Sequence, residues 1–253
     1  MHDTVTAAED SQSLIVEDQG AVRILRMNRP DKLNALNTAL TTALLDGLVA
    51  ADNDKSVRAI VLTGEGRGFC AGGDLSEFKF LTPEHQDAVV HRSHLTATVQ
   101  SLPQKITKPI ISAVRGVAAG GGAGLAIACD MMVAGRDLRL FYPEVKHSIV
   151  PAIVMTGLQR QLGRKLAFEM ISLNKVLGAE EALEAGIANR VVDPENVVEA
   201  ALEIAQEWAK VHPVAMAATK NLFYRVADLP FEAAMAAGRD VNGLMRGFKG
   251  KSA

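Results

Sequence analysis

The chain has 253 residues, 48% of them hydrophobic and 22% charged, an ordinary balance for a globular protein with a sizeable core. Its formal net charge of −2 gives no basic surface for nucleic acid or an anionic membrane, so neither partner is expected. Two cysteines make no disulfide framework, and the first residues lack the regions of a secretory signal. We therefore expect a cytoplasmic protein.

Residues 1–12 are polar and are expected to form a mobile tail. After them, short apolar runs bounded by turn residues alternate with longer segments whose apolar residues recur at helical spacing. The predicted strands are 14–16, 22–27, 57–63, 110–114, 131–134, 138–141 and 187–192. The predicted helices are 38–51, 83–106, a segment ending near Cys129, and, within a mostly helical stretch from residue 152, 195–211, 213–226 and 231–246.

Strands that alternate with helices favour right-handed crossovers and a largely parallel sheet, so the fold class is predicted to be α/β. We expect the sheet domain to cover residues 13–192. The remaining residues, 193–253, are alanine-rich and amphipathic and are predicted to form a helical region. Such an appendage commonly buries its apolar face against a partner subunit or its own domain.

Two glycine-rich turns, each following an apolar strand, carry the main chemical signal: 68–74 (Gly-Phe-Cys-Ala-Gly-Gly-Asp) and 116–124. A strand that ends in glycines and enters a helix leaves backbone N–H groups unpaired, and a substrate atom can touch that backbone. Two such turns on neighbouring strands can aim two donors at one oxygen, as in an oxyanion hole. Plain turn chemistry remains the alternative, although neither turn has the spacing of a dinucleotide motif.

Other catalytic chemistries have little support in the sequence. His91 and His94 are spaced for one helix face, but no third ligand follows at a telling distance, so no metal site is expected. No Gly-x-Ser-x-Gly elbow is present, and neither Cys70 nor Cys129 has a nearby histidine. Covalent catalysis by serine or cysteine is therefore not expected.

Several short segments follow one another along the chain and are informative as an ordered set: 27–30 (Met-Asn-Arg-Pro), 34–36 (Asn-Ala-Leu), 59–64, 69–75, 108–116 before the triple glycine, 128–130, 143–145 and 182–188. Together these segments resemble the crotonase superfamily, the enoyl-CoA hydratase/isomerase group, from Val22 to about Phe223. The resemblance implies a spiral of ββα units with a C-terminal helical region that builds homotrimers, often paired into hexamers. It also implies an acyl-CoA thioester substrate and no cofactor beyond the coenzyme A of that substrate.

The resemblance also assigns residues. It places the two oxyanion-hole N–H groups on Gly73 and Gly121. Further residues expected along the bound coenzyme A are Ala71, Asp74 and Leu75, with Lys32 as a candidate for the nucleotide phosphates. Residues 75–100 are expected to supply the variable walls of the acyl pocket.

One departure from the family pattern concerns the acid–base residues. Hydratases of the superfamily hold the attacking water with two glutamates, and the matching positions here are Gly124 and Glu144. Glycine can neither hold nor deprotonate water, whereas one carboxylate is enough to carry a proton from C2 to C4. The sequence therefore favours double-bond isomerisation, with Glu144 as the acid–base residue.

Two alternatives remain open. The segment 150–155 after Glu144 resembles members labelled as branched (methylglutaconyl-type) hydratases, some of which also have glycine at the position of Gly124. In that reading His147, one helical turn from Glu144, orients the carboxylate or binds water, although the plainer reading of His147 is a surface histidine. The second alternative is a crotonase fold that binds acyl-CoA without turnover and serves as an assembly or RNA-binding subunit.

Overall fold

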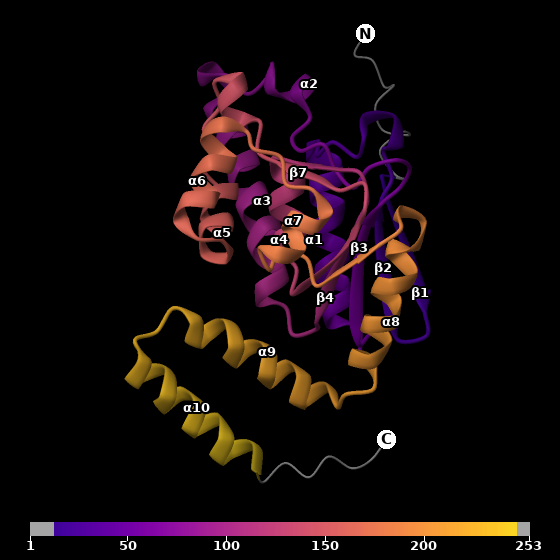
Figure 1. Cartoon of the computed structure of the whole chain (residues 1–253), viewed down its shortest axis with the longest axis vertical. Helices are drawn as coiled ribbons and strands as arrows, with labels where there is room; N and C mark the ends of the chain where they lie inside the picture. The colour runs from indigo at the N-terminus through magenta and orange to yellow at the C-terminus, as the bar shows by residue number, and fades with distance from the viewer. Residues whose placement is uncertain (1–12, 247–253) are drawn as a thin grey trace.

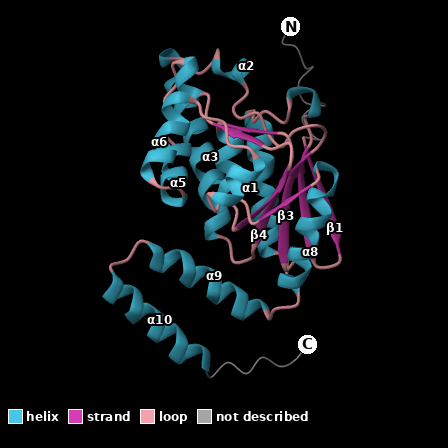
Figure 2. Ribbon diagram, in the orientation of Figure 1, coloured by secondary structure: helices cyan, strands magenta, loops and turns pink. Residues whose placement is uncertain are grey.

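The computed structural model describes residues 13–246. The tail expected at 1–12 lies outside the described residues, as does the segment 247–253. The described chain is an α/β structure in which helices cover both faces of a central sheet, followed by a pair of C-terminal helices (Figure 1). Figure 2 shows the same arrangement by secondary structure.

The strands are β1 (Leu14–Gln19), β2 (Val22–Met27), β3 (Ala59–Gly64), β4 (Ile110–Val114), β5 (Val117–Ala119), β6 (Met131–Gly135), β7 (Arg139–Phe141) and β8 (Arg190–Val192). The helices are α1 (Thr38–Asn53), α2 (Leu75–Phe78), α3 (Gln86–Lys105), α4 (Gly121–Ala128), α5 (Val154–Gln161), α6 (Arg164–Leu173), α7 (Ala179–Glu184), α8 (Val197–Ala209), α9 (Pro213–Ala227) and α10 (Phe231–Arg246). Short 3-10 turns are η2 (Pro30–Lys32), η3 (Pro83–His85), η4 (Glu144–His147) and η5 (Pro194–Asn196).

The main sheet has the strand order β1-β2-β3-β4-β6-β8. Strand β1 pairs antiparallel with β2, and every other pairing in this sheet is parallel. A second, smaller sheet consists of β5 and β7, also parallel. The largely parallel α/β sheet expected from the sequence is therefore confirmed.

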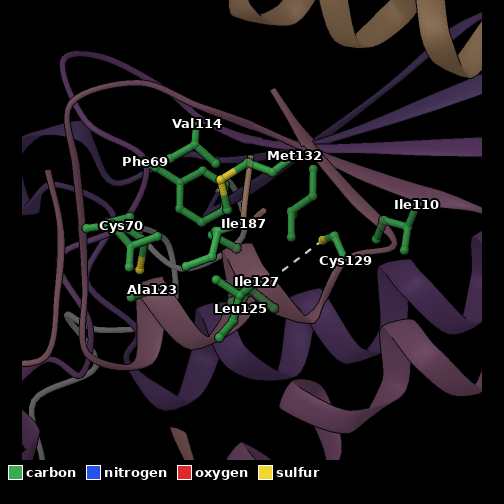
Figure 3. Packing of buried hydrophobic residues seen from close by; sticks show 14 of the residues in the cluster. Phe69, Cys70, Ile110, Val114, Ala123, Leu125, Ile127, Cys129, Met132 and Ile187 are labelled. Atoms are coloured by element: carbon green, nitrogen blue, oxygen red, sulfur yellow. Dashed lines mark hydrogen bonds between the residues drawn. The ribbon is translucent and has the colours of Figure 1, made fainter. Parts of the chain in front are cut away.

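Both faces of the main sheet are buried, which is what parallel strands with helical crossovers require. On β2, Leu25 and Met27 point into one apolar cluster, which includes residues of α1, α3 and α4. Val22 and Ile24, at the alternate positions, point into a second cluster that α8 covers. Figure 3 shows part of the first cluster, where the side chains beneath the two glycine turns meet those of the sheet.

The second glycine turn differs from its predicted form because it contains a strand. Residues 117–119 form β5, which lies beside β7 with Ala119 opposite Phe141. An isolated bridge between Cys70 and Ala118 joins this strand to the first glycine turn. A three-residue strand is too short to show any periodicity, so the sequence predicts turns on neighbouring strands but gives no sign of β5 itself.

Helices α9 and α10 lie below the sheet domain in Figure 1. Helix α9 is tied to that domain by Lys220 Nζ and Tyr224 OH, which lie 2.7 Å from the two carboxylate oxygens of Asp130. Large apolar side chains on the pair remain exposed, including Phe223, Phe231 and Leu244. Within residues 13–246, no helix is long and apolar enough to cross a membrane.

Candidate active site

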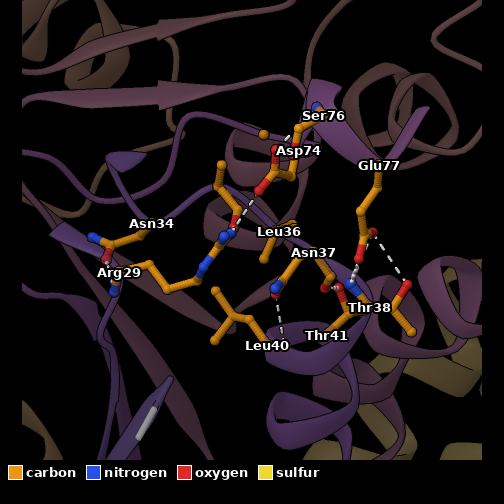
Figure 4. Close-up of polar contacts among 12 residues, drawn as sticks. Arg29, Asn34, Leu36, Asn37, Thr38, Leu40, Thr41, Asp74, Ser76 and Glu77 are labelled. Atoms are coloured by element: carbon orange, nitrogen blue, oxygen red, sulfur yellow. Dashed lines mark hydrogen bonds and ion pairs between the residues drawn. The ribbon is translucent and has the colours of Figure 1, made fainter. Parts of the chain in front are cut away.

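The first glycine turn is held by the buried side chain of Asn34. Its Nδ2 donates to the carbonyl oxygens of Gly68 and Phe69 at 2.9 and 3.1 Å, and also to Glu65. Asn34 has a φ of 55°, a left-handed conformation that asparagine tolerates better than most residues. Figure 4 shows Asn34 beside Arg29, whose backbone N–H donates to Asn34 Oδ1.

A parallel bridge then fixes the direction of the Gly73 N–H group. Leu36 donates its N–H to the Gly72 carbonyl at 2.7 Å and accepts the Asp74 N–H at 3.1 Å. In this pattern Leu36 bonds the residues on either side of Gly73, so the N–H of Gly73 points the other way. Among the described residues, Gly73 N donates to no backbone acceptor.

The second donor is Gly121, the first residue of α4. The first N–H groups of a helix have no partner within it. Gly120, with a φ of 50°, precedes it and donates its own N–H to Phe141 at 2.9 Å. A Cβ atom on Gly121 would lie 3.9 Å from Gly73 N, so the two residues expected to form an oxyanion hole are close neighbours.

A cavity of about 400 Å³ opens at these two residues. Of the residues expected from sequence, Ala71, Gly73, Leu75, Gly121, Glu144 and His147 line it. Lys32 is exposed in η2, and Lys32, Asp74 and Gly124 do not line the cavity. The wall includes residues between 75 and 96 on α2, α3 and the loop between them, as expected from sequence. A larger hollow of about 700 Å³ beside α5 and α6 contains neither glycine turn.

The small sheet positions Glu144 at the wall of the cavity. Strand β7 ends at Phe141, and Glu144 begins η4 three residues later. The carboxylate packs directly against the second glycine turn, since a Cβ atom on Gly120 would lie only 2.6 Å from Glu144 Oε1. Any residue other than glycine at 120 would therefore collide with the carboxylate and strain the backbone.

The Glu144 carboxylate is half-buried and poorly satisfied. Its Oε2 is buried and accepts no hydrogen bond from residues 13–246. Burial raises the pKa of Glu144, and a backbone hydrogen bond within the residue and the nearby His147 only partly offset the effect. A carboxylate with a raised pKa is a better proton acceptor near neutral pH, as an acid–base residue requires.

The space beside Gly124 is occupied by Gln100 of α3. A Cβ atom at 124 would lie 2.6 Å from Gln100 Oε1 and 2.9 Å from Val154 Cγ1. The other end of the same amide, Gln100 Nε2, donates to the Gly121 carbonyl at 2.7 Å. The sequence reasoning missed Gln100, because it belongs to no motif and lies on a polar helix distant in sequence from both turns.

Asp74 is engaged with protein groups and does not face the cavity. Its Oδ2 lies 2.9 Å from Arg29 Nη1, and its Oδ1 accepts hydrogen bonds from the backbone and hydroxyl of Ser76 (Figure 4). Burial alone would raise the pKa of Asp74, but the bonds from Ser76 and Arg29 outweigh it and leave that pKa lowered. Asp74 therefore anchors the end of the first glycine turn to Arg29.

Among the described residues, the two cysteines and the potential metal ligands form no second site. Burial raises the pKa of the Cys70 thiol to about 12, so it stays protonated near neutral pH. Cys129 is also buried and unpaired. In the part of the chain that the structure describes, no cluster of three or more His, Cys, Asp or Glu side chains is placed to hold a metal ion.

Comparison with known proteins agrees with this fold and site. The family model described as enoyl-CoA hydratase/isomerase matches residues 17–244. The 2,3-dehydroadipyl-CoA hydratase of Escherichia coli is 36% identical over 231 residues, which cover 90% of this chain and 88% of that protein. The structure also matches an enoyl-CoA hydratase subunit from Geobacillus kaustophilus, with a TM-score of 0.86, 32% identity and coverage of 93% of this chain and 90% of that one.

An enoyl-CoA hydratase from Bacillus anthracis matches with a TM-score of 0.88 and 28% identity, over 94% of this chain and 92% of that chain. The chain therefore belongs to the enoyl-CoA hydratase/isomerase (crotonase) family. The α/β fold with C-terminal helices α9 and α10 matches the structures of that family.

Proposed function

We propose that this protein is an enzyme that moves the double bond of an enoyl-CoA thioester, with Glu144 as the only acid–base residue. The observation that carries the proposal is the pair of side chains that pack against the second glycine turn. Glu144 faces the second glycine turn as a carboxylate with a raised pKa, whereas the space beside Gly124 holds the uncharged amide of Gln100. A neutral amide cannot deprotonate water, and Glu144 is the only carboxylate among the described residues that line the cavity.

In this mechanism the thioester oxygen lies between the N–H groups of Gly73 and Gly121. Glu144 removes a proton from C2 of a 3-enoyl thioester, and the electron pair of that C–H bond delocalises onto the oxygen as a dienolate. The two backbone donors stabilise the negative charge as it develops. Glu144 then returns the proton to C4, the double bond settles between C2 and C3, and the carboxylate is regenerated.

Hydration is the second candidate. The three relatives described above are named as enoyl-CoA-type hydratases, among them the 2,3-dehydroadipyl-CoA hydratase of Escherichia coli. Two groups favour it in this chain: Gln100 Oε1 accepts no hydrogen bond from residues 13–246, and His147 lines the cavity. Either can hold a water molecule, but deprotonating that water would still fall to Glu144. A turnover-free binding protein is disfavoured by the raised pKa of Glu144 at this position.

The test is a direct comparison of two assays on the wild-type protein. A 3-enoyl-CoA is followed for appearance of the conjugated thioester, and a 2-enoyl-CoA is followed for its loss. We expect the first reaction to be faster. Brisk hydration without any double-bond shift would replace isomerisation by hydration as the function, and absence of both would favour the turnover-free alternative.

We also propose that the chain self-associates as a homotrimer or a pair of trimers through the C-terminal helices. Support comes from the large apolar side chains that α9 and α10 leave exposed, among them Phe223 and Phe231. Light scattering during size-exclusion chromatography tests this point, and a monomeric mass would contradict it.

A further inference from the structure

One stripe of side chains on helix α3 contacts the second glycine turn directly and reaches the first through Leu36, which pairs with Gly73. Arg92, Thr96 and Gln100 are spaced by four residues and therefore lie on one face of the helix. Arg92 and Thr96 line the cavity, and Gln100 lies one turn further along, beside Gly121 and Gly124. No motif places these residues in the site.

The first contact supports the Gly73 side of the site. Arg92 is only 7% exposed, and its Nη2 donates to the Leu36 carbonyl at 2.8 Å. That carbonyl is the one that also accepts the Asp74 N–H in the bridge around Gly73. Thr96 Oγ1 holds the other end of the guanidinium, 2.6 Å from Arg92 Nη1. Arg92 therefore fixes the segment whose bridge directs the Gly73 N–H into the cavity.

The second contact supports the Gly121 side. Gln100 Nε2 donates to the Gly121 carbonyl at 2.7 Å. Gly121 has no side chain, and its N–H has no acceptor within the helix that it begins, so the bond from Gln100 restrains this residue through its carbonyl group. Gly124 leaves the space that the Gln100 amide needs in order to reach this carbonyl.

We propose that Arg92 and Gln100 are positioning residues for the oxyanion hole, one for each of its two donors. The proposal rests on the assignment of Gly73 and Gly121 as those donors. Because both residues stand on a single helix, α3 sets the separation of the two N–H groups as one rigid element. Donors are useful only when both stand about 3 Å from the same oxygen, so this separation determines the rate.

The experiment compares two ligands that differ at the carbonyl alone. Hexanoyl-CoA is a saturated thioester, and S-hexyl-CoA is the thioether in which a methylene replaces the carbonyl. Calorimetric binding of both reports how well the donors hold the oxygen, independently of turnover. We expect the wild type to prefer the thioester, and Q100M to lower this preference on the order of 10-fold. A misplaced donor should also reduce kcat by about 10²-fold with little change in KM.

Gln104 provides the matched control, since it lies on the next turn of α3 and donates to neither glycine turn among the described residues. Q104M should keep both the ligand preference and kcat. R92M should lower the preference as Q100M does, whereas R92K should restore part of it, because lysine can still donate to the Leu36 carbonyl.

The outcomes distinguish failure of the oxyanion hole from failure of the positioning role alone. If the wild type shows no preference for the thioester, the oxyanion hole and the proposed function both fail. If it shows the preference and Q100M keeps both preference and kcat within about threefold, the positioning role is overturned while the function stands. Should Q100M unfold, Q100E keeps the shape but replaces the donor by an acceptor, and an unchanged preference in that variant overturns the proposal equally.

Discussion

The side chain of Gln100 fills the space that a side chain at Gly124 would need, since a Cβ atom at 124 would lie 2.6 Å from Gln100 Oε1. A glutamate introduced at 124 must therefore displace Gln100, and with it the hydrogen bond to the Gly121 carbonyl. We expect G124E alone to lower isomerisation by at least about 10-fold without adding hydration, because it disturbs a donor of the oxyanion hole. Coupled assays on 3-enoyl- and 2-enoyl-CoA measure both rates.

Removal of the obstacle should change this result. Q100A/G124E removes the nearer of the two side chains that crowd position 124, so that only Val154 has to shift to admit the new carboxylate opposite Glu144. Hydration of a 2-enoyl-CoA by this variant should exceed that by Q100A by about 10-fold or more. Q100A alone is the control for loss of the amide. A folded double variant that hydrates no faster than Q100A would show that a carboxylate at 124 is not the missing element.

Glu144→Gln should abolish turnover while leaving acyl-CoA binding within a few-fold of wild type. The amide keeps the shape beside Gly120 but cannot accept a proton. Single-turnover kinetics and calorimetric binding of hexanoyl-CoA measure the two effects separately. Retention of activity within threefold of wild type would remove Glu144 from the role of base.

Gly73→Pro should lower kcat by about 10²-fold or more, because proline has no N–H to offer the thioester oxygen. Proline also introduces a Cβ atom, which at this position would lie 2.6 Å from Phe78 Cζ. Gly73→Ala is the matched control, since alanine brings the same Cβ atom and keeps the N–H. A proline variant as active as the alanine variant would exclude Gly73 from the oxyanion hole.

The raised pKa of Glu144 predicts an acid limb in kcat/KM, which should decline as pH falls through a value above the unshifted 4.5. His147 partly offsets the rise, so H147Q should move this limb to higher pH.

The same shift predicts a change in stability with pH. Between pH 4.5 and the raised pKa, Glu144 binds more protons in the folded protein than in the unfolded chain. The contribution of Glu144 to the free energy of unfolding therefore falls as pH rises through that window. Chemical unfolding of wild type and E144Q across these pH values should show the loss in the wild type alone.

The centre of the main sheet was predictable because β3 and β4 are buried on both faces and read as continuous apolar runs, of which 110–114 matches β4 in both bounds. The candidate site residues Gly73, Gly121 and Glu144 could also be predicted from the sequence, because each belongs to a local motif. Gln100 and Arg92 could not be predicted from the sequence, since their contribution comes from tertiary contacts between α3 and two distant loops. A polar side chain on an exposed-looking helix gives the same sequence signal whether it faces water or a backbone carbonyl.

The two glycine turns pack backbone against backbone, which limits the positions in them that can carry a side chain. Cβ atoms on Gly72 and Gly122 would lie 2.7 and 2.3 Å from the carbonyl oxygens of Ala119 and Cys70, and such atoms cannot move aside. The obstacles at Gly124 are the ends of two side chains, Gln100 and Val154. Substitutions at positions 100, 124 and 154 therefore leave this backbone contact between the two turns intact. A library confined to these positions would explore different proton carriers beside it, although changes at 100 also remove the Gln100 bond to the Gly121 carbonyl.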